Sequence, residues 1–405
     1  MSSLEYLRRA DFTFTRQLGS VWKDDPRDVP ELHHQVRADI LARVEASARG
    51  TETPLGLVLK GDAGTGKTHL LGELRRMAME RNMFFLYVDM TDVRDFAKTL
   101  LLGITDSLTR AEEGRIPQLR HVIAALFMQS EGLQGRAVSR EEGLEYAAAM
   151  AALDEFSLRE ATKKLVDVLW KIRRGSLAHA PVDIIRTLLG LNTETSQDFW
   201  SLCASWLQGT PLDEFDGRSR LQLANCAPDP WKIVQDLFWV LHFRGPTVLA
   251  FDQLDNCFPL LEAARIAPDH EEGKMATLVL GEIGRGFGAL RDSLNPSTLA
   301  VVACFGGTWE LLKRRVLASF TDRYTEPHTL LPVTEASMAR DLVAKRLTAG
   351  REIFSPPSLT WPFTSAFFAS AANLSPREIL RYCDRHRDAC LAHGEVRERN
   401  HVEEN

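Results

Sequence analysis

The sequence predicts an α/β chain in which a parallel sheet is interrupted by a long helical insertion and followed by an all-helical C-terminal part. Short apolar runs typical of buried parallel strands alternate with helical patterns on both sides of a stretch, about residues 110–230, that contains helical patterns only. Such alternation is typical of a doubly wound sheet. We expect the first part of the α/β core over residues 1–109, the insertion over 110–230, the second part of the core over 231–330 and a helical lid over 331–405.

The expected strands are short apolar runs, several of them followed by a polar residue. They cover Leu57–Leu59, Met83–Val88, Thr247–Phe251 and Leu299–Phe305. Asp89 and Asp252 follow the second and third of these runs. Aspartate and threonine are favoured helix caps, so Asp92 is expected to cap the helix after the second strand and Thr308 the helix after the fourth.

The composition is that of an ordinary globular protein. The 405 residues are 44% hydrophobic and carry a net charge of −6, which gives no global attraction to DNA or to an acidic membrane. The six cysteines are scattered through a long chain, as reduced thiols usually are. No signal-peptide layout and no apolar run of about 18 residues is present. We expect a cytoplasmic protein without a membrane partner.

The run from Gly61 to Thr68 matches the phosphate-binding loop pattern G-x-x-x-x-G-K-[ST] in full. Glycines allow successive backbone N–H groups to turn toward a phosphate, and the helix that follows points its positive end at the same charge. Lys67 is expected on the outer phosphates and Thr68 on Mg²⁺. The sequence therefore predicts a Mg²⁺·ATP site, with a loop made of Gly61, Asp62, Ala63, Gly64, Thr65, Gly66, Lys67, Thr68 and His69.

A second half of this site is expected where the run Val248-Leu-Ala-Phe-Asp252 ends. An aspartate at the end of a strand neighbouring the loop strand can hold Mg²⁺ together with Thr68. Gln253 follows directly, and a neutral amide can orient water but cannot accept its proton. Asp255 is the nearby carboxylate that a turn could bring to the γ-phosphate.

The order of these motifs resembles the AAA+ superfamily, in particular its initiator-type branch of origin-recognition, helicase-loading and transposition-regulating ATPases. The resemblance places Thr308 at the sensor-1 position, where it would help to fix the attacking water; a plain helix cap is the alternative. It places Arg323 at the arginine finger that reaches a neighbouring subunit, with a surface arginine as the alternative. Arg377, at the start of a lid helix, matches the nucleotide-contacting sensor-2 arginine.

One departure from the family pattern leaves two functional hypotheses, which differ in whether ATP is hydrolysed. AAA+ ATPases generally carry glutamate where this chain has Gln253. The first hypothesis is an ATPase whose nucleotide state controls self-assembly or an effector protein, with slow hydrolysis in which Gln253, Asp255, Thr308 and Arg323 take part. The alternative is an ATP-gated switch or scaffold with little or no hydrolysis. A small-molecule kinase lacks a recognisable acceptor site.

The partner of this expected ATPase is less defined by the sequence. Initiator-type proteins usually carry a winged-helix domain after the lid, and this chain ends soon after it, so DNA is a possible but not a required partner. The insertion, including Trp206-Leu-Gln-Gly-Thr-Pro-Leu212, resembles inserts of ATPases from phage-defence systems of the BREX type. Its helix from Leu158 carries Lys163, Lys164, Lys171 and Arg174 beside Trp170, either as a docking stripe or as a solvated face.

Two further patterns are assigned to packing. The glycines at 281, 284, 286 and 288 follow no strand, so they are not a dinucleotide fingerprint and we expect a helix over Lys274–Ser293. Cys383, His386, Cys390 and His393 lie along one stripe of one helix over about 15 Å, too straight to surround one metal ion. The segment Val29–His33 either covers the adenine base or simply packs.

Overall fold

The computed structural model describes residues 3–13, 20–49, 55–112, 114–169, 181–257, 259, 262, 266, 269–294, 297–315, 323–325, 327–352 and 354–402. Its centre is a five-stranded parallel sheet in the order β2-β3-β4-β1-β5. The strands are β1 (Leu57–Lys60), β2 (Phe84–Asp89), β3 (Thr247–Asp252), β4 (Thr298–Cys304) and β5 (His328–Thr329). The predicted α/β class, with its insertion and its C-terminal helices, is confirmed.

Both faces of the sheet are covered, which explains why strands such as β3 and β4 carry apolar residues on both faces and not only at every second position. On one face, alternate strand residues such as Leu59 and Ala250 pack with α2 (His34–Arg49) and α3 (Lys67–Glu80). On the other face, residues such as Val58 and Phe251 pack with α4 (Phe96–Thr109), α10 (Pro230–Leu241) and α12 (Glu271–Ser293). The result is a three-layer core that fixes the strand ends.

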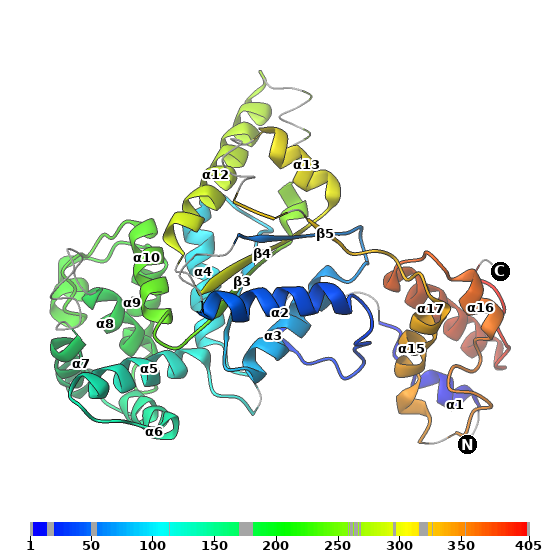
Figure 1. The fold of residues 1–405 in the computed structure, drawn as a ribbon, viewed down its shortest axis with the longest axis horizontal. Helices are drawn as coiled ribbons and strands as arrows, with labels where there is room; N and C mark the ends of the chain where they lie inside the picture. Colours follow the sequence, from blue (N-terminus) through cyan, green and yellow to red (C-terminus); the bar gives the residue numbers. More distant parts are fainter. Residues whose placement is uncertain are drawn as a thin grey trace.

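The insertion is helical in the part of it that the structure describes. It contains α5 (Gln118–Leu133), α6 (Arg140–Ala151), α7 (Glu155–Leu169), α8 (Val182–Leu191), α9 (Gln197–Leu207) and the short η3 (Phe215–Arg220). Its buried residues belong to the same apolar cluster as one face of the sheet. Figure 1 shows these helices (green) as a lobe on the side of the core away from the C-terminal helices.

The C-terminal helices form a second lobe with its own apolar cluster. They are α15 (Ala336–Arg346), η5 (Thr348–Gly350), α16 (Ser365–Ser370) and α17 (Pro376–His393). The N-terminal helix α1 (Ser3–Arg8) packs into the same cluster through Tyr6 and Leu7, so both chain ends lie in this lobe (Figure 1). The chain then passes through η1 (Ser20–Trp22) to reach the core.

Two expected caps are different in the structure. Asp95, and not Asp92, caps α4, because its side chain accepts from the amide of Lys98 at 3.1 Å. Thr308 does not cap α13 (Gly306–Arg315), because the helix begins two residues earlier. Strand β4 ends at Cys304, one residue before the expected Phe305.

The glycine assignment is confirmed, and the α17 stripe packs inward at Cys383, His386 and Cys390 but not at His393. The four glycines lie inside α12. On α17, Cys383 and Cys390 are buried, the ring Nε2 of His386 bonds to the carbonyl of Arg397 at 2.9 Å, and His393 is exposed. Among the described helices, none is long and apolar enough to cross a lipid bilayer. Lys163 and Lys164 are exposed on α7, whereas Trp170, Lys171 and Arg174 lie outside the described residues.

Gly286 is a position where the packing between α12 and α4 requires glycine. A Cβ at this position would collide with the ring of Phe96, whereas a Cβ at Gly281 of the same helix would meet nothing within 4 Å. We expect Gly286→Ala to destabilise the protein by about 1–3 kcal/mol, because overpacking outweighs the gain in helix propensity. Gly281→Ala is the matched control and should stabilise by about 0.5–1 kcal/mol. Thermal unfolding midpoints test this, and equal effects of both substitutions would contradict it.

Candidate nucleotide-binding site

The predicted phosphate loop connects the carboxyl end of β1 to the first turn of α3. Gly64 and Gly66 adopt positive φ values of 86° and 103°, which only glycine adopts without strain. The hydroxyl of Thr65 donates to the carbonyl of Asp62 at 2.9 Å and closes the turn. The loop is thus built as the sequence predicts, with the N-terminus of α3 at its end.

The side chain of Lys67 folds back onto its own loop. Its Nζ donates to the carbonyl of Gly61 at 2.7 Å, lies 3.5 Å from a carboxylate oxygen of Asp255 and sits 4.2 Å from the ring centre of Phe305. Its side chain is only 10% exposed. These are weak, replaceable partners for an ammonium group, which a phosphate can displace.

Thr68 and Asp252 meet although their strands are not neighbours. The sequence-based expectation of adjacent strands was wrong, because β4 lies between β1 and β3. The loop nevertheless brings the Thr68 hydroxyl to 2.7 Å from Asp252 Oδ2. A hydroxyl and a carboxylate at this distance are hard oxygen donors of the kind that Mg²⁺ prefers, so the residues present fit the ion.

Asp252 is almost fully buried, at 2% exposure. Burial raises the pKa of its carboxyl, and hydrogen bonds from Thr68 and from the amide of Gln253, together with the charge of Lys67, offset part of that effect. Tyr87 approaches the same oxygen at 3.4 Å. A buried carboxylate whose pKa stays raised despite these groups is a site where a cation is stabilising.

Gln253 and Asp255 follow in a tight turn. Gln253 has a φ of 63°, an unusual left-handed conformation for a side chain other than glycine. The chain then enters η4 (Leu254–Cys257), which returns Asp255 toward the loop. Asp255 Oδ1 accepts from the amide of Phe305 and, at 3.2 Å, from the hydroxyl of Thr308, while Oδ2 faces Lys67.

Thr308 therefore contacts Asp255, and it is fully buried. It is not among the residues that line the cavity. Arg323 lies farther away, against α12. Its guanidinium donates to the carbonyl of Gly288 and lies 3.0 Å from Asp292. Arg323 therefore has partners within its own chain.

Arg377 comes to the loop from the lid helix α17. Its amide donates to the carbonyl of Gly64 at 3.3 Å, and its side chain packs so closely that a Cβ on Gly64 would collide with it. Its guanidinium forms no hydrogen bond or ion pair with any residue the structure describes, and the side chain is exposed. An arginine held over a phosphate loop with free donors is suited to bind a phosphate.

One cavity of about 910 Å³ joins these groups, large enough for a nucleotide. Its walls come from the loop, from η4, from the lid and from the segment that precedes α2. They include Asp62, Ala63, Gly64, Gly66, Lys67, Thr68, His69, Asp252, Gln253, Asp255, Phe305, Arg346 and Arg377. Val29 and Leu32 line the same cavity, as the adenine-covering alternative for Val29–His33 requires.

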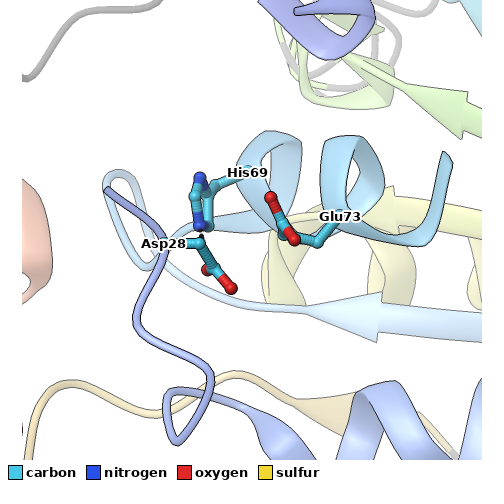
Figure 2. Close-up of side chains that lie close together, drawn as sticks. All are labelled: Asp28, His69 and Glu73. Atoms are coloured by element: carbon cyan, nitrogen blue, oxygen red, sulfur yellow. Dashed lines mark hydrogen bonds and ion pairs between the residues drawn. The ribbon is translucent and has the colours of Figure 1, made fainter. Parts of the chain in front are cut away.

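The segment before α2 is also tied to the loop by hydrogen bonds. The ring of His33 bonds to the carbonyl of Thr65 at 2.8 Å. His69 bonds to Asp28 at 2.6 Å, and Arg37 pairs with the same carboxylate at 2.9 Å. Figure 2 shows Asp28 and His69 facing each other, with Glu73 nearby on α3. Because Arg37 already neutralises Asp28, and Arg76 neutralises Glu73, this cluster is a structural junction and not a metal site.

Several of these contacts were not predicted. Phe305, Asp28 and Arg346 carry no motif, and each takes part only because the fold brings distant segments together. Arg346, from α15 of the lid, lies 3.8 Å from Asp25. His33 lies in the Val29–His33 segment considered for the adenine base, but its bond to Thr65 was not expected.

No protein-family model and no curated protein sequence matches the chain. Among solved structures it is similar to Cdc6p from Pyrobaculum aerophilum, at 13% identity and a TM-score of 0.39, over 94% of this chain and 67% of that one. It is also similar to the Orc1 protein of Aeropyrum pernix in complex with DNA, at 16% identity and a TM-score of 0.36, over 94% and 65%.

The chain thus spans about two thirds of the length of these two structures. TM-scores this low do not assign a function. The class of protein rests on the parallel sheet, the phosphate loop after β1 and the helical lid that contacts it: this is a P-loop NTPase fold of the α/β class.

The junction at Asp28 generates a stability prediction. Burial raises the pKa of this carboxyl, but hydrogen bonds from His69 and Arg37 outweigh burial and hold the pKa well below its usual range. Asp28→Asn should destabilise the protein by about 2–3 kcal/mol, because it leaves Arg37, 8% exposed, without its charge partner. Urea unfolding of both proteins measures the difference.

The same experiment has a predicted pH dependence. Because the folded-state pKa is lowered, the stabilisation by Asp28 is fully present above the unfolded value of about 3.9 and is lost as the pH falls through the folded value. The difference between wild type and Asp28→Asn should shrink as the pH falls below about 4. Asp92→Asn, at an exposed carboxylate, is the control and should stay within about 0.5 kcal/mol. A difference that persists unchanged to pH 3 would contradict the assignment.

Proposed function

We propose that this protein is a Mg²⁺·ATP-binding ATPase of the AAA+ type whose nucleotide state controls self-assembly or an effector protein. One observation carries the proposal. Lys67, the Thr68–Asp252 pair and Arg377 surround a single nucleotide-sized cavity although they come from three separate parts of the chain. Fold alone supports many functions, so the convergence of these particular groups is what favours ATP.

The roles follow from the contacts. Lys67 would leave Gly61 and Asp255 and bind the outer phosphates, and Arg377 would bind a phosphate from the lid side. Thr68 and Asp252 would hold Mg²⁺, which neutralises phosphate charge when bound. The backbone amides of the loop from Gly61 to Gly66, with the N-terminus of α3, provide further donors.

Hydrolysis requires that the oxygen of water bonds to the γ-phosphorus, that the bond to the β-phosphate oxygen breaks and that a base accepts the proton of water. Gln253 lines the cavity but cannot accept a proton. Asp255 can, through Oδ2, once Lys67 has moved to the nucleotide. The amide of Phe305 and the hydroxyl of Thr308 would keep Asp255 in place, so we assign Thr308 a positioning role.

An ATP-gated switch with little hydrolysis is the second candidate. It is favoured by the neutral Gln253 and by the engagement of both Asp255 oxygens by other groups. In either case lid movement is the natural output, because Arg377 connects the loop to the lid. Arg323 would act on a neighbouring subunit only after leaving Gly288 and Asp292. The resemblance suggests a DNA transaction or phage defence as the setting.

ATP binding should depend on Lys67. Lys67→Ala removes the point charge of the loop and should weaken ATP binding at least about tenfold, or about 1.4 kcal/mol. Titration with a fluorescent ATP analogue measures the affinity. Lys60→Ala is a matched control, because Lys60 ends β1 beside the loop and pairs with Glu310 at 3.6 Å. Equal affinity of the Lys67→Ala protein and wild type would place the nucleotide elsewhere.

Turnover should depend on Asp255 if the protein hydrolyses ATP. Asp255→Asn keeps an acceptor for Phe305 but removes the base, so steady-state phosphate release should fall by about 10²–10⁴-fold while ATP affinity is retained. Asp92→Asn is the control. If wild-type release is already near background and Gln253→Glu raises it, the switch candidate is favoured. Brisk release that survives Asp255→Asn would refute the role of Asp255 and leave Gln253 as the group that positions water.

A further inference from the structure

A cationic cluster lies at the edge of the sheet opposite the nucleotide cavity. Phe84 and Thr247 are paired at the start of β2 and β3, whereas the cavity lies at the carboxyl ends of these strands. The strands are six residues long, which separates the two edges by about 15–20 Å. Arg244, in the turn before β3, places its guanidinium 4.5 Å from the ring centre of Phe84.

The insertion contributes the other members of this cluster. Arg140, the first residue of α6, lies 3.5 Å from ring Nδ1 of His121 on α5. Its other terminal nitrogen donates to the side-chain oxygen of Asn82, in the turn before β2. The cluster thus joins the core and the insertion, and Arg140, His121 and Arg244 are all partly exposed to solvent.

The charges in this cluster are not compensated within the described part of the chain. No described carboxylate forms an ion pair with Arg140 or Arg244, and none of the side-chain donors of Arg244 bonds to a described residue. The carboxylate of Glu142, in the first turn of α6, accepts instead from the amide of Ser139. Most other arginines here pair with a carboxylate, as Arg120 beside the cluster does with Glu194.

Burial and the positive charges in this cluster lower the pKa of both Arg244 and His121. Burial and the nearby Arg140 lower the pKa of Arg244 to about 10. Burial, Arg244 and Arg140 lower the pKa of His121 to about 3, so the imidazole is neutral at pH 7. Two guanidinium groups close enough to interact electrostatically, with no described carboxylate paired to either, favour the binding of an anion.

We propose that Arg140, Arg244 and His121 form a second anion site, distinct from the nucleotide cavity, that binds a dianionic phosphate as inorganic phosphate or as a phosphate monoester. Two guanidinium groups match the charge of −1.5 to −2 that such a phosphate carries at pH 7. Guanidinium donors suit phosphate oxygens, and the side chains come from the core and from the insertion. A bound phosphate therefore connects Arg140 of the insertion with Arg244 of the core.

The test is a phosphate titration of the full chain, observed through the imidazole NMR signals of His121, which the His121→Gln spectrum assigns. Phosphate should shift these signals in a saturable way, with half-saturation at or below about 5 mM, whereas sodium chloride of equal ionic strength should not. His33 and His69 report separately on the nucleotide loop, so binding there is distinguished. Phenyl phosphate, added in a parallel titration, shows whether the site also accepts a monoester.

Two variants and one matched control decide the result. Arg140→Gln and Arg244→Gln should each weaken phosphate binding at least about tenfold. Arg136→Gln, in the same α5–α6 connection but 59% exposed and paired with Glu131, should leave binding unchanged. If Arg244→Gln fails to fold, Arg140→Gln alone decides. The proposal is overturned if the His121 signals show no saturable shift, or if the shift is the same in Arg140→Gln as in wild type.

Discussion

The hydrogen bond between Thr68 and Asp252 is the contact on which the rest of the site depends, because it joins residues 184 positions apart. It requires the whole central sheet: β1 must deliver the loop, β3 must end level with it, and β4 must lie between them in register. Burial of the strands on both faces supplies that rigidity. A site assembled across a packed sheet keeps its geometry without help from a ligand.

The lid and the N-terminal segment both line the cavity and are connected to each other. Arg377 contacts the loop from α17, and Lys345 of the lid donates to the carbonyl of Asp28, whose side chain bonds to His69. A phosphate bound to Lys67 and Arg377 would therefore be sensed by the lid and, through Asp28, by the segment that lines the cavity at Val29. If a nucleotide binds as proposed, these contacts would connect it to the C-terminal lobe.

Site residues whose geometry is set by neighbouring residues in the sequence could be predicted, whereas residues placed by tertiary contacts could not. The loop, β1 and α3 form a local unit whose glycines and lysine specify their own geometry, so these residues could be predicted. The approach of Asp252 to the loop could be predicted too, but not the strand order, because apolar runs carry no information on which strands are adjacent. Phe305 and Asp28 depend on tertiary contacts alone. Asp95 caps α4 instead of Asp92 because the helix begins at Phe96, and helix ends are predicted from a sequence only to within a few residues.

Thr68 and Asp252 are proposed to hold one Mg²⁺ together beside the nucleotide. The most direct measurement is the Mg²⁺ dependence of ATP affinity in a double-mutant cycle of Thr68→Ala and Asp252→Asn. If both residues serve one ion, each single substitution should abolish most of the Mg²⁺ effect, and the double substitution should cost little more than the worse single one. Strictly additive losses, or a Mg²⁺ effect that survives in the double variant, would contradict the account.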